Sequence, residues 1–193
     1  MKTILTEIRS AVMVTLALAV VCCGIYPLVV FGVGQALFPD KANGSLILEA
    51  DGTVRGSRLL GQHFTGEKYF HTRPSSAGNG YDAASSGGSN LGPTSQKLRD
   101  SIAQNVVDYR TQNGLRTNVP VPADAVTGSA SGLDPHISPE NAQLQAGRVA
   151  KARGLSLEVL YPLIRKHTEP PDLGFLGDSG VNVLSLNLAL DQL

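Results

Sequence analysis

The chain has 193 residues, in which 16 Lys and Arg balance 16 Asp and Glu, so the formal net charge is zero. This length accommodates one ordinary domain and one additional feature, and the balanced charge excludes the basic excess that is typical of a nucleic-acid-binding protein. Few aromatic residues (5%) and many glycines and prolines (21 and 11) predict a small domain with many turns and a modest core.

The first predicted element is a membrane-spanning helix. No charged residue occurs between Arg9 and Asp40, and the sequence between them is almost wholly apolar. A bilayer core about 30 Å thick needs roughly 20 apolar residues in a helix. A cleavable signal peptide has a shorter apolar region, about 7–15 residues before a small-residue site, whereas this run is longer and ends in QALFPD. We therefore expect a short cytoplasmic N-terminus (1–10), an uncleaved helix (11–38) and an extracytoplasmic domain (39–193).

The flanking charges predict the orientation of this helix. Before the helix, three positive charges (Lys2, Arg9 and the amino terminus) are opposed by one negative charge, that of Glu7. After it, the charges of Asp40 and Lys41 cancel. Because positive charge is retained in the cytoplasm, we expect a single-pass protein with a cytoplasmic N-terminus and the bulk of the chain outside.

Cys22 and Cys23 both lie within the apolar run. Adjacent positions project about 100° apart on a helix, which is a poor geometry for a disulfide between them. We interpret them as small apolar residues, so that the exported domain has no disulfide and depends on packing. Tyr26–Pro27 is expected to kink the helix, as proline does in a helix interior.

Beyond the anchor, the pattern predicts an α+β domain. The sequence around Asp51–Gly52 alternates in the manner of a hairpin of two short strands. A Gly-, Ser- and Asn-rich stretch over residues 69–95 is typical of a flexible linker in composition, but its aromatic residues and its arginine are equally consistent with an ordered loop or a docking surface. Apolar residues spaced by four then predict a helix over residues 93–113, which ends at Gly114.

Residues 131–155, SGLDPHISPENAQLQAGRVAKARGL, combine an acid, a histidine, two prolines and two arginines in the manner of an active site. Most of these residues are explained by helix ends. Ser138 is a good N-cap, Pro139 suits the first helical position, and Gly154 ends the helix.

Two further elements complete the predicted domain. A helix is expected from Ser156 to about Lys166, although Pro162 must bend or shorten it. Finally, VNVLSLNLAL (181–190) places leucines at alternate positions, a period of two that predicts a strand closing the domain.

Short motifs that could indicate catalysis have weak context. GDSG (177–180) resembles the nucleophile segment of chymotrypsin-like proteases, but the glycine that continues that motif is replaced by Val181. We interpret it as a turn. GNGYDA (78–83) fits a dinucleotide fingerprint formally, yet it lies in the Ser/Gly-rich stretch rather than between a strand and a helix.

The four histidines, at positions 63, 71, 136 and 167, show no zinc-site spacing. His136 follows Asp134–Pro135, where a local hydrogen bond is the simplest role; a metal ligand or a catalytic base is the alternative. From the residues alone, a membrane-anchored exported hydrolase and a solute-binding module both stay open.

Three ordered blocks resemble the KdpC family, the C subunit of the potassium-transporting Kdp P-type ATPase. They are GQHFTGEKYFHTRPSSAGNGYDAASSGGSNLGPTS, SGLDPHISPENAQLQAGRVAKARGL and GFLGDSGVNVLSLNLALD, and with the N-terminal helix the resemblance covers essentially the whole chain. One departure is Ser179–Gly180, where the family pattern suggests something like Pro-Arg before Val-Asn-Val.

The resemblance implies an accessory, non-catalytic subunit in the inner (plasma) membrane of a bacterium. Its implied partners are a potassium-conducting subunit, a P-type ATPase subunit with an Asp-Lys-Thr-Gly-Thr motif and a small membrane subunit, which handle ATP and K⁺; no cofactor is expected on this chain. KdpC proteins have been described as raising the ATP affinity of the ATPase subunit. The expected topology places the loops of this chain outside the cell, so we expect such an effect to be indirect.

Within the three blocks, nine residues are candidates for docking to partner subunits. They are Tyr69, Phe70, Arg73, Ser89, Asn90, Asp134, His136, Arg148 and Asn182. Arginine and aromatic residues are enriched at interface hot spots, whereas Asp and Asn often fix turns. Arg73 is the first choice for a contact with a partner carboxylate. For each of these residues, the sequence is as consistent with an internal structural role as with a contact to a partner subunit.

Overall fold

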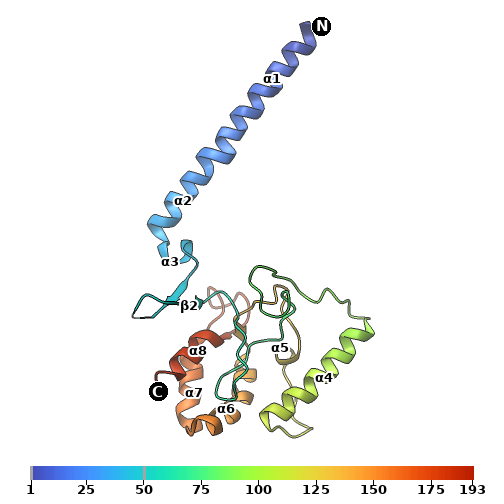
Figure 1. Cartoon of the computed structure of the whole chain (residues 1–193), viewed down its shortest axis with the longest axis vertical. Coiled ribbons are helices and arrows are strands. Elements are labelled where there is room, and N and C mark those ends of the chain that lie inside the picture. The colour runs from blue at the N-terminus through green and yellow to red at the C-terminus, as the bar shows by residue number, and fades with distance from the viewer. Residues whose placement is uncertain (1, 50) are drawn as a thin grey trace. The chain divides into compact units, whose positions relative to one another are not determined.

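The computed structural model describes residues 2–49 and 51–193, apart from the side chain of Lys2. The Lys2 charge, on which part of the predicted orientation depends, therefore lies outside the described residues. The chain divides into two compact units, Met1–Ser57 and Arg58–Leu193, which are described separately (Figure 1).

The first unit contains a long helix. Helix α1 (Lys2–Ala19), the π-helical segment η1 (Val20–Ile25) and helix α2 (Tyr26–Leu37) follow one another without a break (Figure 1). Among the described residues, this is the one helix whose length and apolar composition suit a membrane span. The predicted single apolar anchor is thus confirmed as a helix; its topological limits at residues 11 and 38 stay predictions.

The predicted disturbance at Tyr26–Pro27 takes the form of the wider π turn. Pro27 has no N–H to donate, and the N–H of Tyr26 donates to the carbonyl of Val21, five residues back. Single π turns in otherwise α-helical segments absorb an additional residue of chain.

A short helix and a hairpin follow in the same unit. Helix α3 (Pro39–Ala42) leads to strands β1 (Leu46–Leu48) and β2 (Val54–Ser57), which pair antiparallel. The Asp51 carboxylate accepts a bond from the Thr53 N–H at 2.8 Å, which fixes the turn. The predicted hairpin is confirmed.

The second unit is a mixed helical and β domain, as predicted. Its elements are α4 (Gln96–Asn113), α5 (Ala123–Val126), β3 (His136–Ile137), α6 (Pro139–Arg153), α7 (Leu157–Lys166), β4 (Thr168–Glu169), β5 (Gly180–Asn182) and α8 (Val183–Leu190). The three short strands form an antiparallel sheet in the order β3-β5-β4. His136 pairs with Asn182 across β3 and β5, and Thr168 pairs with Val181 across β4 and β5.

The ends of α4 and α6 have capping residues, as predicted for Ser138, Gly114 and Gly154. The Ser95 hydroxyl accepts from the N–H of Leu98 at the start of α4, and the Ser138 hydroxyl accepts from the N–H of Asn141 at the start of α6. Gly114 and Gly154 end these helices with φ of +62° and +66°, a left-handed conformation that favours glycine. Helix α7 runs through Pro162 to Lys166, so the proline does not shorten it.

The predicted strand over residues 181–190 is wrong beyond Asn182. The chain leaves β5 there and forms helix α8, whose first turn is capped by the Asn182 side chain accepting from the N–H of Ser185 at 3.1 Å. Helix α8 is buried on most of its surface, so its sequence lacks the 3.6-residue period of a surface helix. Leucine alternating with Ser185 and Asn187 gives the period of two that is typical of a strand, although the segment is helical.

One hydrophobic core lies among these helices and the sheet. Small residues of α6 allow the close approach of α7 and β5, and leucines of α8 fill the remaining space. Its buried members are Phe70, Ile137, Ala142, Ala146, Val149, Ala150, Leu160, Ile164, Val181, Val183, Leu186 and Leu190.

Candidate functional site

Residues 67–71, which precede the first helix of the second unit, form a segment that is held by side-chain amides of α6 and α8. Asn187 accepts from the N–H of Phe70 at 2.8 Å and donates to its carbonyl at 2.9 Å. Gln145 does the same for His71, at 2.8 and 3.1 Å. Two amide groups therefore pair with the backbone of this segment much as a neighbouring strand would.

Arg148 anchors the same segment from within the domain. Its side chain is buried, and it donates to the carbonyls of Glu67 at 2.6 Å and Tyr69 at 2.9 Å. It also donates to Asn113 at 3.0 Å and to Gln145 at 2.9 Å. Burial lowers the pKa of the guanidinium, but arginine stays charged at physiological pH. The charge is thus satisfied by dipoles of this chain rather than by a carboxylate.

Tyr69 is half-exposed at the edge of this segment. Its ring lies 5.0 Å from the guanidinium of Arg153 and 5.1 Å from the ammonium of Lys68, both in cation–π geometry. Its hydroxyl donates to Asp191 at 3.0 Å. Phe70, the next residue, is fully buried and belongs to the core.

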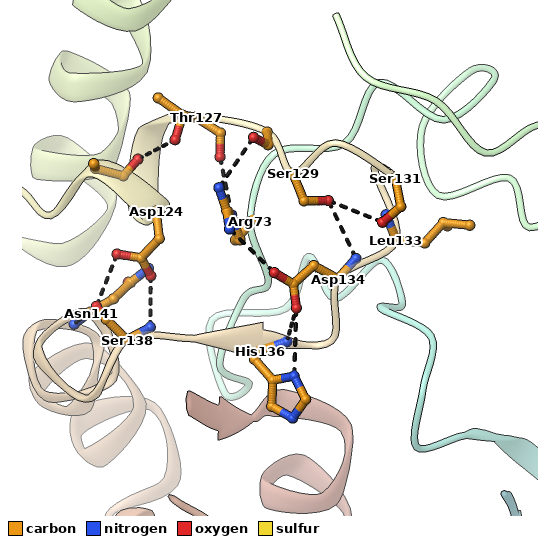
Figure 2. Close-up of polar contacts among 12 residues, drawn as sticks. Arg73, Asp124, Thr127, Ser129, Ser131, Leu133, Asp134, His136, Ser138 and Asn141 are labelled. Atoms are coloured by element: carbon orange, nitrogen blue, oxygen red, sulfur yellow. Dashed lines mark hydrogen bonds and ion pairs between the residues drawn. The ribbon is translucent and has the colours of Figure 1, made fainter. Parts of the chain in front are cut away.

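Arg73, Asp134 and His136 form a second polar cluster (Figure 2). The guanidinium of Arg73 donates to the Asp134 carboxylate at 3.2 Å and to the carbonyls of Thr127 and Gly128 at 3.4 and 3.2 Å. The other carboxylate oxygen of Asp134 accepts the N–H of His136 at 2.9 Å. This arrangement ties residues 127–136 to the first block.

The ring of His136 lies between two carboxylates. Its Nδ1 is 3.5 Å from Asp134, and its Nε2 is 3.2 Å from Glu169. The hydrogen bond to Asp134, opposed by partial burial and supported by Glu169, raises the pKa of His136. Partial burial acts against ionisation of Asp134, but hydrogen bonds from His136 and the charge of Arg73 outweigh it and lower the pKa of that carboxyl. The cluster therefore favours a charged histidine between two anions.

Asn182 connects this cluster to the start of the unit. Besides capping α8, its buried side chain donates to the carbonyl of Arg58 at 2.9 Å. Its Nδ2 also lies 3.4 Å from Nε2 of His136.

Ser89 and Asn90 lie apart from both clusters and are exposed. Asn90 has φ of +52°, a left-handed conformation that Asn tolerates better than most residues. The loop before them packs closely on Gly132, where a Cβ would lie 2.7 Å from the N of Ala77 and the carbonyl oxygen of Gly87. The Gly/Ser-rich stretch is therefore an ordered loop at this point.

The structure thus brings Tyr69, Phe70 and Arg148 together in one group and Arg73, Asp134, His136 and Asn182 in another. Phe70, Arg148 and Asn182 are buried and carry internal roles. Arg73 meets the carboxylate of this chain's own Asp134. For the exposed and half-exposed members, docking stays a prediction.

The short motifs lie in turns. The segment GNGYDA contains three residues with positive φ, Gly78, Gly80 and Tyr81, and has no strand before it or helix after it. Residues 177–179 of GDSG lie in the exposed turn before β5, and Gly180 is the first residue of that strand. Among the described residues, no group of three or more His, Cys, Asp or Glu side chains could hold a metal ion.

A cleft of about 520 Å³ lies beside the anchored segment. His71, Tyr81 and Gln145 are among its lining residues, and each already makes hydrogen bonds within the chain. Burial and the charge of Arg148 lower the pKa of His71, so its ring is neutral at physiological pH.

Known proteins are similar to this sequence over nearly its whole length. The family model for KdpC, the c chain of K⁺-transporting ATPase, matches residues 8–192. The potassium-transporting ATPase KdpC subunit of Mycobacterium tuberculosis (strain ATCC 25618 / H37Rv) is 56% identical over 187 residues, which are 97% of this chain and 98% of the relative.

The chain belongs to the KdpC family. KdpC subunits of Nitratidesulfovibrio vulgaris and Koribacter versatilis are 54% and 51% identical, over 98% of this chain and 95% and 94% of theirs. The resemblance seen in the sequence is therefore confirmed, and the positions of all nine candidate docking residues lie within the matched range, residues 8–192.

Several anchoring residues of this KdpC chain were missed in the sequence. Gln145 lies on α6 and Asn187 on the largely apolar α8, and a buried side-chain amide requires a hydrogen-bonding partner nearby. Asp124 accepts from both the N–H and the hydroxyl of Ser138, at 2.8 and 2.9 Å, and so supports the start of α6 (Figure 2). Nothing in the spacing of Asp124 and Ser138 indicates that pairing.

Proposed function

We propose that this chain is the accessory C subunit of an ATP-driven potassium uptake system, needed for assembly and activity of the complex. The family match over residues 8–192 carries the proposal. The partners would be a potassium-conducting subunit, a P-type ATPase subunit and a small membrane subunit. The chain itself would be non-catalytic, and the partners would handle ATP and K⁺.

The ordered loops of the second unit support a docking role. Residues 66–73 are fixed by buried polar side chains and residues 127–136 by the partly buried pair of Arg73 and Asp134, which lowers the entropy lost on binding a partner. The contact surface would be formed by half-exposed side chains of these residues, such as Tyr69 and Arg73, together with the exposed Ser89 and Asn90 of the Gly/Ser-rich loop.

An effect on ATP affinity would be indirect. A subunit that binds one conformational state of a pump more tightly shifts the pump toward that state, and with it the affinity for other ligands. With the N-terminus in the cytoplasm, the second unit would lie outside, away from cytoplasmic ATP.

Co-purification tests the proposal. The full chain, tagged after Leu193, is purified in mild detergent from cells that make the partners, and potassium-stimulated ATP hydrolysis is assayed. We expect two larger membrane proteins to follow the tag, one of them with an Asp-Lys-Thr-Gly-Thr motif, together with activity. A chain that emerges alone contradicts the proposal.

The orientation has a separate test. A reporter that is active only in the cytoplasm, fused after Leu193, should be silent, whereas the same reporter fused before Lys2 should be active. Activity of the C-terminal fusion would reverse the proposed topology.

A further inference from the structure

The turn between β4 and β5 presents three apolar side chains to solvent. Leu173, Phe175 and Leu176, called the apolar tip below, are 83%, 74% and 51% exposed. The turn is formed by its own backbone bonds. Asp172 and Leu176 exchange N–H···O bonds of 3.0 and 2.9 Å, and the N–H of Gly174 donates to Pro171 at 3.0 Å. The apolar tip is therefore a defined structure.

The backbone of the tip is strained at Leu173. Its φ is +54°, in the left-handed region that leucine disfavours and that Gly or Asn adopts at lower cost. A leucine so exposed returns little packing energy to the fold. Local strain combined with a cluster of exposed apolar side chains is typical of an interaction site.

The charges around the tip indicate the kind of partner. Between residues 170 and 180 the chain contains Asp172 and Asp178 and no Lys or Arg, and Glu169 just before them is paired with His136. An acidic border is repelled by anionic lipid headgroups, whereas it complements a protein pocket with basic side chains at its rim. Apolar anchors in such pockets dominate binding energy.

We propose that the apolar tip inserts into an apolar pocket with a basic rim on a membrane-embedded subunit of the same complex. This inference rests on the proposed function, and it adds a docking element to the nine candidates selected from the sequence. The tip supplies the apolar anchor, and the acidic border sets its orientation.

Photo-cross-linking of the whole complex tests the contact. A photoreactive phenylalanine derivative replaces Phe175 in the tagged full chain, and the control places it at Val107, a 57% exposed residue of α4. Irradiation should join position 175 to a protein subunit and join position 107 to it much less. An adduct with lipid in place of protein, or no adduct at 175, overturns the proposal.

Reassembly provides the quantitative test. Purified full-length chain is added to a complex that lacks it, and restored potassium-stimulated ATP hydrolysis is followed against chain concentration. The double variant Leu173→Asn/Phe175→Ser should need about tenfold more chain for half-maximal activity, the loss expected of a hot-spot anchor. Val107→Ser should match wild type. Since Asn tolerates the left-handed conformation, the double variant should also unfold at no lower temperature than wild type.

The outcomes separate the two proposals. If the wild-type chain neither co-purifies with partners nor restores activity, the proposed function fails and the docking inference falls with it. If the wild-type chain restores activity and the double variant does so at the same concentration, the docking inference alone is wrong. Asp178→Asn should weaken the dependence of reassembly on salt concentration, because it removes one charge from the acidic border.

Discussion

Arg148 shows how one side chain can organise a segment distant in sequence. It lies on α6 and donates to carbonyls of Glu67 and Tyr69, about eighty positions earlier in the chain. Replacing it with alanine would leave those buried carbonyls unsatisfied as well as remove the donor, and the unsatisfied groups carry most of the penalty.

We expect Arg148→Ala to lower the free energy of unfolding by about 3 kcal/mol. Thermal unfolding of the full chain in mild detergent, followed by circular dichroism, measures the change. Arg116→Ala, at an exposed position, is the matched control and should be nearly neutral. Equal stability of the two variants would contradict the anchoring role.

His136 predicts a pH dependence with a definite sign. Its pKa is raised above the ordinary value of 6.5 by Asp134 and Glu169, so its stabilising contribution is complete below that value and is lost as pH rises through the folded-state pKa. His136→Gln should therefore lower the melting temperature more at about pH 5.5 than at about pH 8.5. Comparing variant with wild type at each pH cancels the opposite effects of His71 and His167, whose pKa values are lowered by burial. A loss that grows with pH would refute this assignment.

At the scale of elements, the cap of α8 combines two functions in one residue. The oxygen of the Asn182 side chain caps the helix, and its nitrogen fixes the carbonyl of Arg58. We expect Asn182→Ala to cost about 2 kcal/mol, the sum of a cap and a buried hydrogen bond. Asn182→Ser keeps a capping oxygen and should fall between alanine and wild type. Urea unfolding would rank the three; a serine variant as unstable as alanine would mean that the cap contributes little.

The elements also show what the sequence can predict. Helices α4 and α6 were predicted because Ser138, Gly114 and Gly154 act through local backbone geometry, which a short stretch of sequence contains. Helix α8 was not, because its burial depends on contacts with distant parts of the chain. For the same reason, the role of Asn187 could not be predicted. Its alternation with leucine suggested a solvent-facing position on a strand, whereas it is buried and bonded to the backbone of Phe70.

The sequence allowed residues of the candidate site to be selected, but it did not predict most of the contacts between them. The three blocks include Arg73, Asp134 and His136, and the structure places them in one cluster (Figure 2). The short strands β3 and β4 have only two residues each, too few for a periodic signal. Their sheet brings Glu169 to His136, a proximity that composition and spacing do not contain.

At the scale of the whole molecule, Arg73 allows an internal structural role to be distinguished from a contact with a partner subunit. Arg73→Ala would either release residues 127–134 or remove a contact with a partner subunit. In both cases we expect cells to need a roughly fivefold higher potassium concentration for growth, which corresponds to a loss of about 1 kcal/mol. Asp134→Asn separates the two explanations. If Arg73 acts through the Asp134 carboxylate, Asp134→Asn should impair growth as much as Arg73→Ala does. If Arg73 binds a partner subunit directly, Asp134→Asn should impair growth much less than Arg73→Ala. Unchanged growth of the Arg73 variant would exclude both roles.

Side chains from elsewhere in the domain hold residues 67–71 through the main-chain groups of that segment. Arg148, Gln145 and Asn187 bond to its N–H and carbonyl groups, and Arg153 bonds to the carbonyl of Lys68 at 2.7 Å. Main-chain groups are the same whichever amino acid other than proline occupies these positions. Outward-facing side chains in the segment can therefore be exchanged without loosening the backbone that these four side chains hold.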